Sequence, residues 1–345
     1  MTPTRVAILG ATGYGGGELL RVLLRHPAVE VTLATSRSET GTPVGQVHAN
    51  LLGLTDLAFT SPTHDQVARD ADLVIGALPH GASAEVLAPY LERGMRVVDL
   101  SGDYRLRDLD AYRTWYKREH PHPEWIEHAV YGSPELNGAA IDDAQLVASP
   151  GCFATAMNLA MMPAAAAGLL RGRPQVVAMT GSSGSGANAK SGTHHPTRAG
   201  TLRPYKVLQH QHVPEVIQAL GDAGSTIAGI DFTPVSAPLV RGILAVVTAD
   251  LTEPRDADAI ARLYRDFYAP HPFVKVLHTR EPECGPVATT NFAEVRARVT
   301  ADGRLHAVCA IDNLVKGGAG QAVQSLNRML GVDETTGLDA PGTWP

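Results

Sequence analysis

The chain has 345 residues, of which 44% are hydrophobic and 19% charged, and a chain of this length is expected to form two domains. Its formal net charge of -6, without a long basic block, makes electrostatic binding to nucleic acid unexpected. Three scattered cysteines do not match a disulfide framework or a paired zinc motif, so no metal site is expected. The N-terminus lacks the layout of a signal peptide, and together these features predict a reduced cytoplasmic protein.

Short apolar segments alternate with helical patterns over the first 150 residues. Segments rich in Val, Ile and Leu, as expected of strands buried on both faces of a parallel sheet, occupy residues 6–9, 31–34, 73–77, 97–100 and 146–148. Apolar residues at helical spacing occupy residues 18–25 and 82–92. This β-α-β order predicts an α/β fold with a Rossmann-type, doubly wound parallel sheet.

An uncharged stretch of 27 residues separates Asp143 from Arg171. Its composition resembles a membrane span, but Pro150, Gly151 and Pro163 interrupt every apolar helix of about 20 residues that could be drawn through it. We therefore expect no membrane association. The stretch predicts a buried strand, a tight turn and a buried helix, with Cys152 at the turn.

The pattern changes after about residue 172. Longer strand candidates occupy residues 242–251, 292–300 and 304–311, and the Asp302-Gly303 turn between the last two favours an antiparallel hairpin. A helical pattern follows at residues 317–330. These features predict a second domain of the α+β type.

A glycine-rich turn directly follows the first predicted strand and directly precedes the first predicted helix. Glycines at positions 10, 13 and 16 permit a tight turn and close approach to a pyrophosphate on the helix N-terminus. An ordinary glycine-rich turn would contain the same residues, but the strand-turn-helix context favours a dinucleotide site. The residues expected to bind the cofactor here are Gly10, Thr12, Gly13, Tyr14 and Gly15.

The end of the second predicted strand bears on the choice between NAD(H) and NADP(H). An NAD-selective site often has an acidic residue there for the ribose 2'-hydroxyl, whereas this chain has Ser36, Arg37 and Ser38. A cationic side chain flanked by hydroxyls suits a 2'-phosphate. NADP(H) is therefore expected, the alternative being that Arg37 is an ordinary solvated arginine.

Cys152 lies in a Pro-Gly turn at the start of the uncharged helix. A helix N-terminus offers a positive dipole end and free backbone N–H groups, which stabilise a thiolate and make it a nucleophile. Cys284 and Cys309 lack such a setting, and we expect them to be structural.

A nucleophilic cysteine needs an acid-base partner, and the histidine-rich segment 205–215 is the best source of one among 14 histidines. Glu215 is available there to orient an imidazole. A metal site built from these histidines is an alternative, but their spacing gives it little support. The small residues 180–187 before the segment are expected either to offer N–H groups and hydroxyls to an anion or to form a flexible loop.

Eight motifs, including the segments already described, occur in order along the chain. They are residues 10–16 (GATGYGG), 77–81 (ALPHG), 99–106 (DLSGDYRL), 131–136 (YGSPEL), 150–152 (PGC), 181–186 (GSSGSG), 210–215 (HQHVPE) and 311–317 (IDNLVKG). With these motifs the chain resembles the N-acetyl-gamma-glutamyl-phosphate reductase family of arginine biosynthesis over residues 6–342. It also resembles the aminoadipyl-phosphate reductase branch of lysine biosynthesis.

The resemblance implies an NADPH-dependent acyl-phosphate reductase that forms a homodimer or homotetramer and works through a cysteine thioester on N-acetyl-L-glutamyl 5-phosphate. An NADP-binding domain would comprise residues 1–150 and about 313–345, and a catalytic, substrate and oligomerisation domain residues 151–312. Cys152 would be the nucleophile and His212 the acid-base group, with His210 the less favoured choice. The resemblance places Arg105, Ser182, His210 and Glu215 at the substrate and Asn313 at the cofactor.

One segment departs from many arginine-pathway members. Residues 192–200 contain His194-His195-Pro196, which lysine-branch members often have, and in that branch a small acidic carrier protein holds the acyl group. Arg198 and Arg203 would then face a protein surface. The N-acetylglutamyl substrate is preferred, with the carrier-linked substrate second and a non-catalytic nucleotide-binding regulator a more distant alternative.

Overall fold

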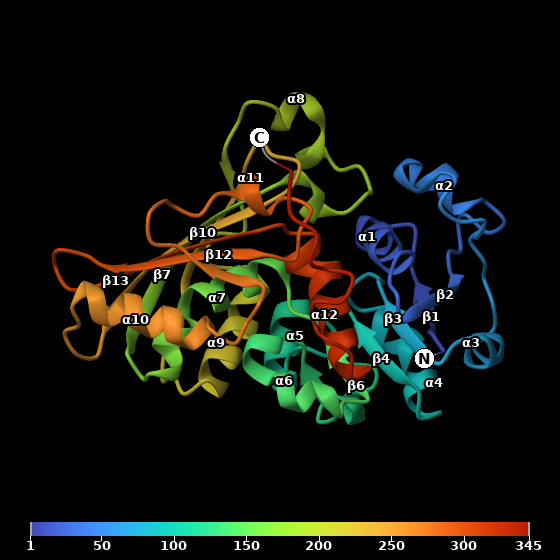
Figure 1. Ribbon diagram of the computed structural model, residues 1–345, viewed down its shortest axis with the longest axis horizontal. Coiled ribbons are helices and arrows are strands. Elements are labelled where there is room, and N and C mark those ends of the chain that lie inside the picture. Colours follow the sequence, from blue (N-terminus) through green and yellow to red (C-terminus); the bar gives the residue numbers. More distant parts are fainter. Residues whose placement is uncertain (1, 344–345) are drawn as a thin grey trace. The chain divides into compact units, whose positions relative to one another are not determined.

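The computed structural model describes residues 2–343 and divides them into two compact units (Figure 1). The first unit comprises the chain as far as residue 150 together with residues 318–340, and the second comprises residues 151–317 with the segment after 340.

A six-stranded parallel sheet forms the centre of the first unit, in the order β2-β1-β3-β4-β6-β5. The strands are β1 (Thr4–Leu9), β2 (Val29–Ala34), β3 (Leu73–Gly76), β4 (Arg96–Asp99), β5 (Ala129–Tyr131) and β6 (Leu146–Ala148). The chain reverses its progress across the sheet between β1 and β3, which is the switch point of a doubly wound fold. The predicted Rossmann-type sheet is confirmed, although the short edge strand β5 was not predicted.

The helices of the first unit are α1 (Tyr14–Leu23), α2 (Val44–Val47), α3 (His64–Asp70), α4 (Ser83–Leu91), α5 (Leu109–Tyr116), α6 (Pro134–Asp142) and α12 (Gly320–Met329). Buried leucines on one face of α1, at positions 19, 20 and 23, produce the helical pattern seen in the sequence. Helix α12, from the end of the chain, contacts α1, α6 and β4.

A seven-stranded mixed sheet forms the second unit, in the order β11-β12-β13-β10-β7-β9-β8. The strands are β7 (Leu170–Thr180), β8 (Arg203–Pro204), β9 (Asp231–Ser236), β10 (Ile243–Leu251), β11 (Val274–Val276), β12 (Ala293–Val299) and β13 (Leu305–Ile311). The predicted hairpin is confirmed as the antiparallel pair β12 and β13, with Gly303 at a φ of +83° in its turn. The pairs β7–β9 and β11–β12 are parallel, so the sheet is mixed.

The helices of the second unit are α7 (Cys152–Ala166), α8 (His195–Arg198), α9 (His212–Asp222), α10 (Ala257–Tyr268) and α11 (Cys284–Val287). Helix α7 contacts α9, α10, β10 and β13 and is buried over nearly its whole length. An α+β second unit, with helices packed on one mixed sheet, is therefore confirmed.

Buried tyrosines compensate for a proline inside α7. Pro163 has no N–H to donate to the carbonyl of Leu159, one turn earlier. The hydroxyl of Tyr268 in α10 donates to that carbonyl at 2.6 Å, and the hydroxyl of Tyr264 donates to the carbonyl of Ala160 at 2.7 Å. The uncharged helix is thereby fixed to α10.

The uncharged stretch between Asp143 and Arg171 contains β6, the turn at residues 149–151 and α7, as predicted. Within residues 2–343, no helix is both long enough and apolar enough to cross a membrane.

Candidate active site

The glycine-rich turn of the first unit joins β1 to α1. Gly10 has a φ of +81°, and a Cβ atom there would lie 2.7 Å from the carbonyl oxygen of Ala77, so only glycine fits. Gly16 lies against Ala11, where a Cβ would approach the Ala11 Cα to 2.5 Å. Gly13 is the N-cap of α1 and has no neighbouring atom within 4 Å of a built Cβ. Two glycines thus serve close packing, and the third leaves space at the helix N-terminus.

The remaining residues expected at the cofactor lie beside this turn or after β2. Thr12 and Gly15 are half-buried, and Tyr14 is exposed at the start of α1. Ser36 is buried, and its Oγ accepts the backbone N–H of Glu39 at 3.2 Å.

Arg37 and Ser38 are exposed, and Arg37 forms no ion pair within residues 2–343. These two side chains, rather than the buried Ser36, are therefore the ones open to a 2'-phosphate. The glycine cradle and the exposed Arg37 together fit NADP(H).

Arg105 also belongs to the first unit. Its guanidinium is buried and donates to the carbonyls of Ser149 at 2.7 Å and Leu100 at 2.8 Å. These carbonyls directly follow β6 and β4, so Arg105 lies at the carboxyl edge of the parallel sheet, where ligands bind in such folds.

Cys152 is the first residue of α7 in the second unit and is half-buried. Gly151 caps the helix with extended backbone (φ -70°, ψ 148°). The thiol therefore lies at the positive end of a 15-residue helix, a position that favours the thiolate. A second glycine adjoins the cysteine, because a Cβ at Gly317 would lie 2.8 Å from the Cys152 Cβ.

His212 is the first residue of α9, and its ring packs directly against Gly151. A Cβ at Gly151 would lie 2.3 Å from the His212 Nε2, so only glycine leaves room for the imidazole. The structure thus brings His212 to the residue immediately before Cys152.

Glu215 follows in the first turn of α9 and is fully buried. Its Oε1 accepts the backbone N–H of Gly151 at 2.7 Å. This bond joins the first turn of α9 to the N-cap of α7, and it holds the segments bearing Cys152 and His212 together. The suggestion that Glu215 is available to orient an imidazole stays a prediction beside this bond to the backbone.

His210 differs from His212 in its surroundings. Its ring is 4% exposed and makes edge contacts with Phe153, Phe232 and Tyr205 at centroid distances of 5.2, 5.4 and 6.1 Å. Its Nδ1 accepts the backbone N–H of His212 at 3.2 Å, which assigns the ring proton to Nε2. Burial, aided by the Lys206 charge, lowers the pKa of His210 to about 3. His210 is therefore a neutral cap of α9.

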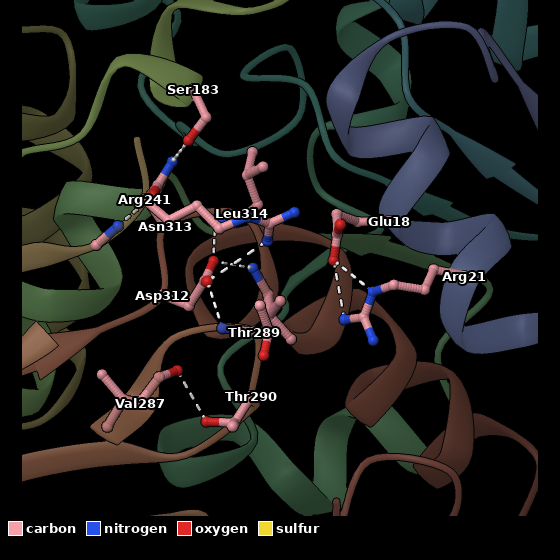
Figure 2. A network of polar contacts seen from close by, with 12 residues as sticks. Glu18, Arg21, Ser183, Arg241, Val287, Thr289, Thr290, Asp312, Asn313 and Leu314 are labelled. Carbon is pink, nitrogen blue, oxygen red and sulfur yellow. Dashed lines mark hydrogen bonds and ion pairs between the residues drawn. The ribbon is translucent and has the colours of Figure 1, made fainter. Parts of the chain in front are cut away.

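Asn313 lies in a network of polar contacts that Figure 2 shows in part. The side-chain amide of Asn313 donates to the Ser183 hydroxyl at 2.9 Å and accepts the Gly242 N–H at 2.7 Å. Ser182 is half-buried at the start of the short helix η3 (Ser182–Ser185). Asn313 thus holds the serine-glycine loop.

Asp312 organises the turn after β13. Its Oδ1 accepts the backbone N–H groups of Leu314 and Val315 at 2.8 and 3.0 Å, and its Oδ2 accepts that of Thr289 at 2.7 Å (Figure 2). Arg241 lies 3.4 Å from the same carboxylate. This turn leads to Gly317, which packs against Cys152.

Arg198 does not lie where the carrier-protein alternative requires it. It is 8% exposed and donates to the hydroxyl of Ser236 and to the carbonyls of Thr180 and Ala237. The expectation that Arg198 faces a protein surface is therefore wrong, because its guanidinium anchors the loop from within. Arg203 is exposed.

The two other cysteines have different surroundings. Burial, together with Asp312 and Glu294, raises the pKa of Cys284 to about 11, and Cys309 is buried within β13. Among the described residues, no group of three or more His, Cys, Asp or Glu side chains is placed to hold a metal ion.

Sequence reasoning missed several residues of this site. Gly317 and Asp312 lie in a motif that was recognised, but the residues they contact, Cys152 and Thr289, are distant in sequence. The aromatic enclosure of His210 by Phe153 and Phe232 left no local signal, because it depends on packing between α7 and β9.

Two family models match the chain. The model described as "Semialdehyde dehydrogenase, NAD binding domain" matches residues 5–144, and "Semialdehyde dehydrogenase, dimerisation domain" matches residues 152–313.

Relatives with two different names match nearly the whole chain. The N-acetyl-gamma-glutamyl-phosphate reductase of Methanosphaera stadtmanae is 41% identical over 100% of both chains, and that of Marinobacter nauticus is 42% identical over 99% of both. An Ignicoccus hospitalis protein with the provisional name LysW-L-2-aminoadipate/LysW-L-glutamate phosphate reductase is 44% identical over 96% of this chain and 97% of its own.

Solved structures share the fold at low identity. Aspartate semialdehyde dehydrogenase II of Vibrio cholerae, complexed with ASA, matches with a TM-score of 0.71 and 17% identity, over 96% of this chain and 99% of its own. The Candida albicans aspartate semialdehyde dehydrogenase with NADP matches with a TM-score of 0.66 and 13% identity, over 95% and 98%.

Proposed function

Since the chain belongs to the N-acetyl-gamma-glutamyl-phosphate reductase family, we propose that it reduces N-acetyl-L-glutamyl 5-phosphate to N-acetyl-L-glutamate 5-semialdehyde with release of phosphate. The observation that carries the proposal is the joining of two helix N-termini in the second unit. Cys152 begins α7, His212 begins α9, and the Glu215 bond to Gly151 holds them together.

The chemistry starts at the thiol. His212 takes the proton of Cys152, and the thiolate attacks the acyl carbon, forming a C–S bond. The C–O bond to phosphate breaks with its electron pair, and the imidazolium returns the proton to the leaving phosphate. Backbone N–H groups at the start of α7 are placed to stabilise the oxyanion. The product of this half-reaction is a thioester on Cys152.

Reduction follows at the same carbon. Bound NADPH supplies the hydride. The resulting oxyanion re-forms its carbonyl, the C–S bond breaks with its electron pair, and Cys152 is released as a thiolate beside the aldehyde. Uptake of one proton from water through His212 restores the starting state and balances the reaction.

Two features support NADP(H) as the cofactor: the glycine cradle at Gly10, and Arg37, which is exposed and forms no ion pair with any described residue. We predict that Arg37→Ala lowers the ratio of kcat/KM for NADPH to that for NADH by about 10-fold, because a charge-assisted contact to the 2'-phosphate is lost. Steady-state kinetics with both cofactors measure the ratio. Arg25→Ala, an exposed arginine between α1 and β2, is the control and leaves the ratio unchanged.

Oligomerisation through the second unit is supported by the match to a dimerisation domain over residues 152–313. The mixed sheet also has a half-exposed apolar face, with Val177, Val246 and Val308 on adjacent strands opposite the buried alternate residues. A homodimer or homotetramer in the cytoplasm is the proposed state.

A carrier-linked aminoadipyl substrate is the second candidate, and the name of the Ignicoccus hospitalis relative favours it. The burial of Arg198 counts against a carrier protein at that residue. The free N-acetylglutamyl substrate is therefore the first choice.

A side-by-side assay of the reverse reaction tests the choice. Purified protein, phosphate and NADP+ are incubated with N-acetylglutamate semialdehyde or with carrier-linked aminoadipate semialdehyde, and NADPH formation is followed by absorbance. We expect phosphate-dependent reduction of NADP+ with the first substrate. Turnover with only the second would reverse the order of the candidates, and turnover with neither would refute the reductase.

A further inference from the structure

Positive charge is concentrated around the cysteine and histidine segments. Residues 144–214 contain six Lys and Arg residues and no Asp or Glu, in a chain whose net charge is -6. The six are Arg171, Arg173, Lys190, Arg198, Arg203 and Lys206. Cys152 and His212 both lie within this cationic segment.

Four of the six are exposed and form no ion pair among the described residues, and three of these four lie beside the histidine segment; the fourth, Arg171, lies at the opposite end of β7 from Thr180. Arg173 is paired with Asp231, and Arg198 is buried in the hydrogen bonds described above. Lys190, Arg203 and Lys206 are exposed and form no ion pair within the part of the chain that the structure describes. We call these three residues the cationic rim.

The rim residues are held near one another and near His212. Arg203 donates to the carbonyl of Gly192 at 3.1 Å, in the same short turn as Lys190. The Lys206 ammonium donates to Gln211 Oε1 at 2.8 Å, and Gln211 directly precedes His212. Although the Lys206 side chain is exposed overall, partial desolvation and the charge of Lys190 lower its pKa, and the second cause agrees with the closeness of the two lysines.

The backbone that presents Lys206 is strained. Lys206 and Leu208 have φ values of +45° and +58°, a left-handed backbone conformation that residues other than glycine and asparagine rarely adopt. Such strain costs free energy, and so does the gathering of three like charges that no carboxylate among the described residues pairs. A bound anion would offset the second cost.

We propose that the cationic rim of Lys190, Arg203 and Lys206 captures anionic substrate from solution and directs it to Cys152. The inference rests on the proposed function, whose acyl phosphate carries a phosphate group and a carboxylate. The rim acts at long range on association, so its effect falls on kcat/KM and weakens as salt screens it.

Alkylation of Cys152 tests the rim without any reductase activity. Iodoacetate and iodoacetamide deliver nearly the same group, but only iodoacetate is an anion. The ratio of their rates at Cys152 is measured by mass spectrometry for wild type and for Lys190→Gln/Lys206→Gln. The control is Arg171→Gln/Arg262→Gln, which removes the same charge from exposed arginines of β7 and α10.

We expect the iodoacetate to iodoacetamide ratio to fall about 3- to 10-fold in the lysine variant at low salt and not in the control. At about 1 M salt the difference between the variants disappears. An unchanged ratio, or an equal fall in the control, overturns the rim. This outcome is independent of whether the wild type reduces acyl phosphates.

Steady-state kinetics with acyl-phosphate substrates then distinguish capture of a free small anion from recognition of a carrier protein. The lysine variant is expected to lose kcat/KM for free N-acetylglutamyl phosphate by a similar factor at unchanged kcat. If only a carrier-linked substrate is affected, the rim recognises a protein and the capture of small anions is overturned.

Discussion

Two strand-turn-helix segments of the described chain are capped by glycine, and the surroundings of their helix N-termini differ. Gly13 before α1 and Gly151 before α7 have similar extended backbones, and neither helix has a side-chain cap from its own N-cap residue. Beside Gly13 the space is empty within 4 Å of a built Cβ. Beside Gly151 the space is filled by His212, and the backbone N–H is bonded to Glu215.

The difference shows how one local motif serves two kinds of chemistry. At α1 the helix end is left open, as needed for the phosphates of a nucleotide. At α7 residues from α9 occupy the helix end, and the positive field there acts on the thiol of Cys152. We propose that the open terminus binds an external anion and that the filled terminus acts on the thiol of the chain itself.

The largest test of this contrast is Cys152→Ser. Loss of the nucleophile is expected to lower kcat about 10⁴-fold or more, while NADPH binding at the first unit is unchanged. Single-turnover kinetics and cofactor fluorescence measure the two effects. Cys284→Ser serves as the control and keeps its activity. A Cys152→Ser protein with full turnover would refute the thioester route.

A second test replaces each of the two capping glycines with alanine in a separate variant. Gly151→Ala places a methyl group 2.3 Å from the His212 ring, which must move, and we expect kcat to fall about 100-fold in a folded protein. Gly13→Ala meets no neighbouring atom and leaves the alkylation rate of Cys152 unchanged, while weakening NADPH binding. Equal effects of both variants on Cys152 alkylation would abolish the distinction between an open and a filled terminus.

The neutral cap of α9 can be tested with a pair of variants. Asparagine at position 210 keeps an acceptor for the His212 N–H, because an Asn Oδ1 bonds the N–H two residues on. Phenylalanine keeps the aromatic packing and loses the acceptor. We expect His210→Phe to lower kcat about 10-fold and His210→Asn to stay near wild type, each with folding checked by circular dichroism. A folded but inactive His210→Asn protein would transfer the acid-base role to His210.

The smallest expected effect is on stability at acid pH. Burial lowers the pKa of His26, His120 and His210 in the folded state, so these rings bind protons mainly in the unfolded chain. Above pH 6.5 these rings are mainly neutral in both the folded and the unfolded chain, so they do not make the free energy of unfolding depend on pH. As the pH falls below 6.5 toward each folded-state pKa, only the unfolded chain binds the protons, and the folded state loses stability. For His210 the loss reaches about 2 kcal/mol at pH 5.

Urea unfolding between pH 8 and pH 5 measures this effect. Burial raises the pKa of Asp99 to about 6, so this carboxyl opposes the histidines, since it binds protons more readily in the folded protein. His210→Asn is expected to flatten the loss of stability by about the contribution of one ring. If the free energy of unfolding of the wild type does not decrease as the pH is lowered from 8 to 5, the burial of these imidazoles is contradicted.

Much of the fold could be predicted because its signals are local. The buried strands of the first unit appear as short apolar runs, and the pair Asp302-Gly303 predicts the hairpin turn in which it lies. Strands β5, β8, β9 and β11 were not predicted, and three of these four have only two or three residues. Arg198 was misplaced because its charge suggests solvent, whereas the ends of β7 and β9 provide oxygen partners for its guanidinium.

The sequence by itself determined the family, the glycine turns and the placing of Cys152 at a helix start, because each depends on residues close together in the chain. It also predicted the histidine segment as the source of an acid-base partner. Only the tertiary structure shows that the two histidines have different surroundings, which is why we propose His212 as the acid-base group. Phe153 and Phe232 keep His210 neutral, and Gly151 receives the ring of His212. The Glu215 carboxylate reaches across 64 residues to the N–H of Gly151, and no local pattern encodes such a contact.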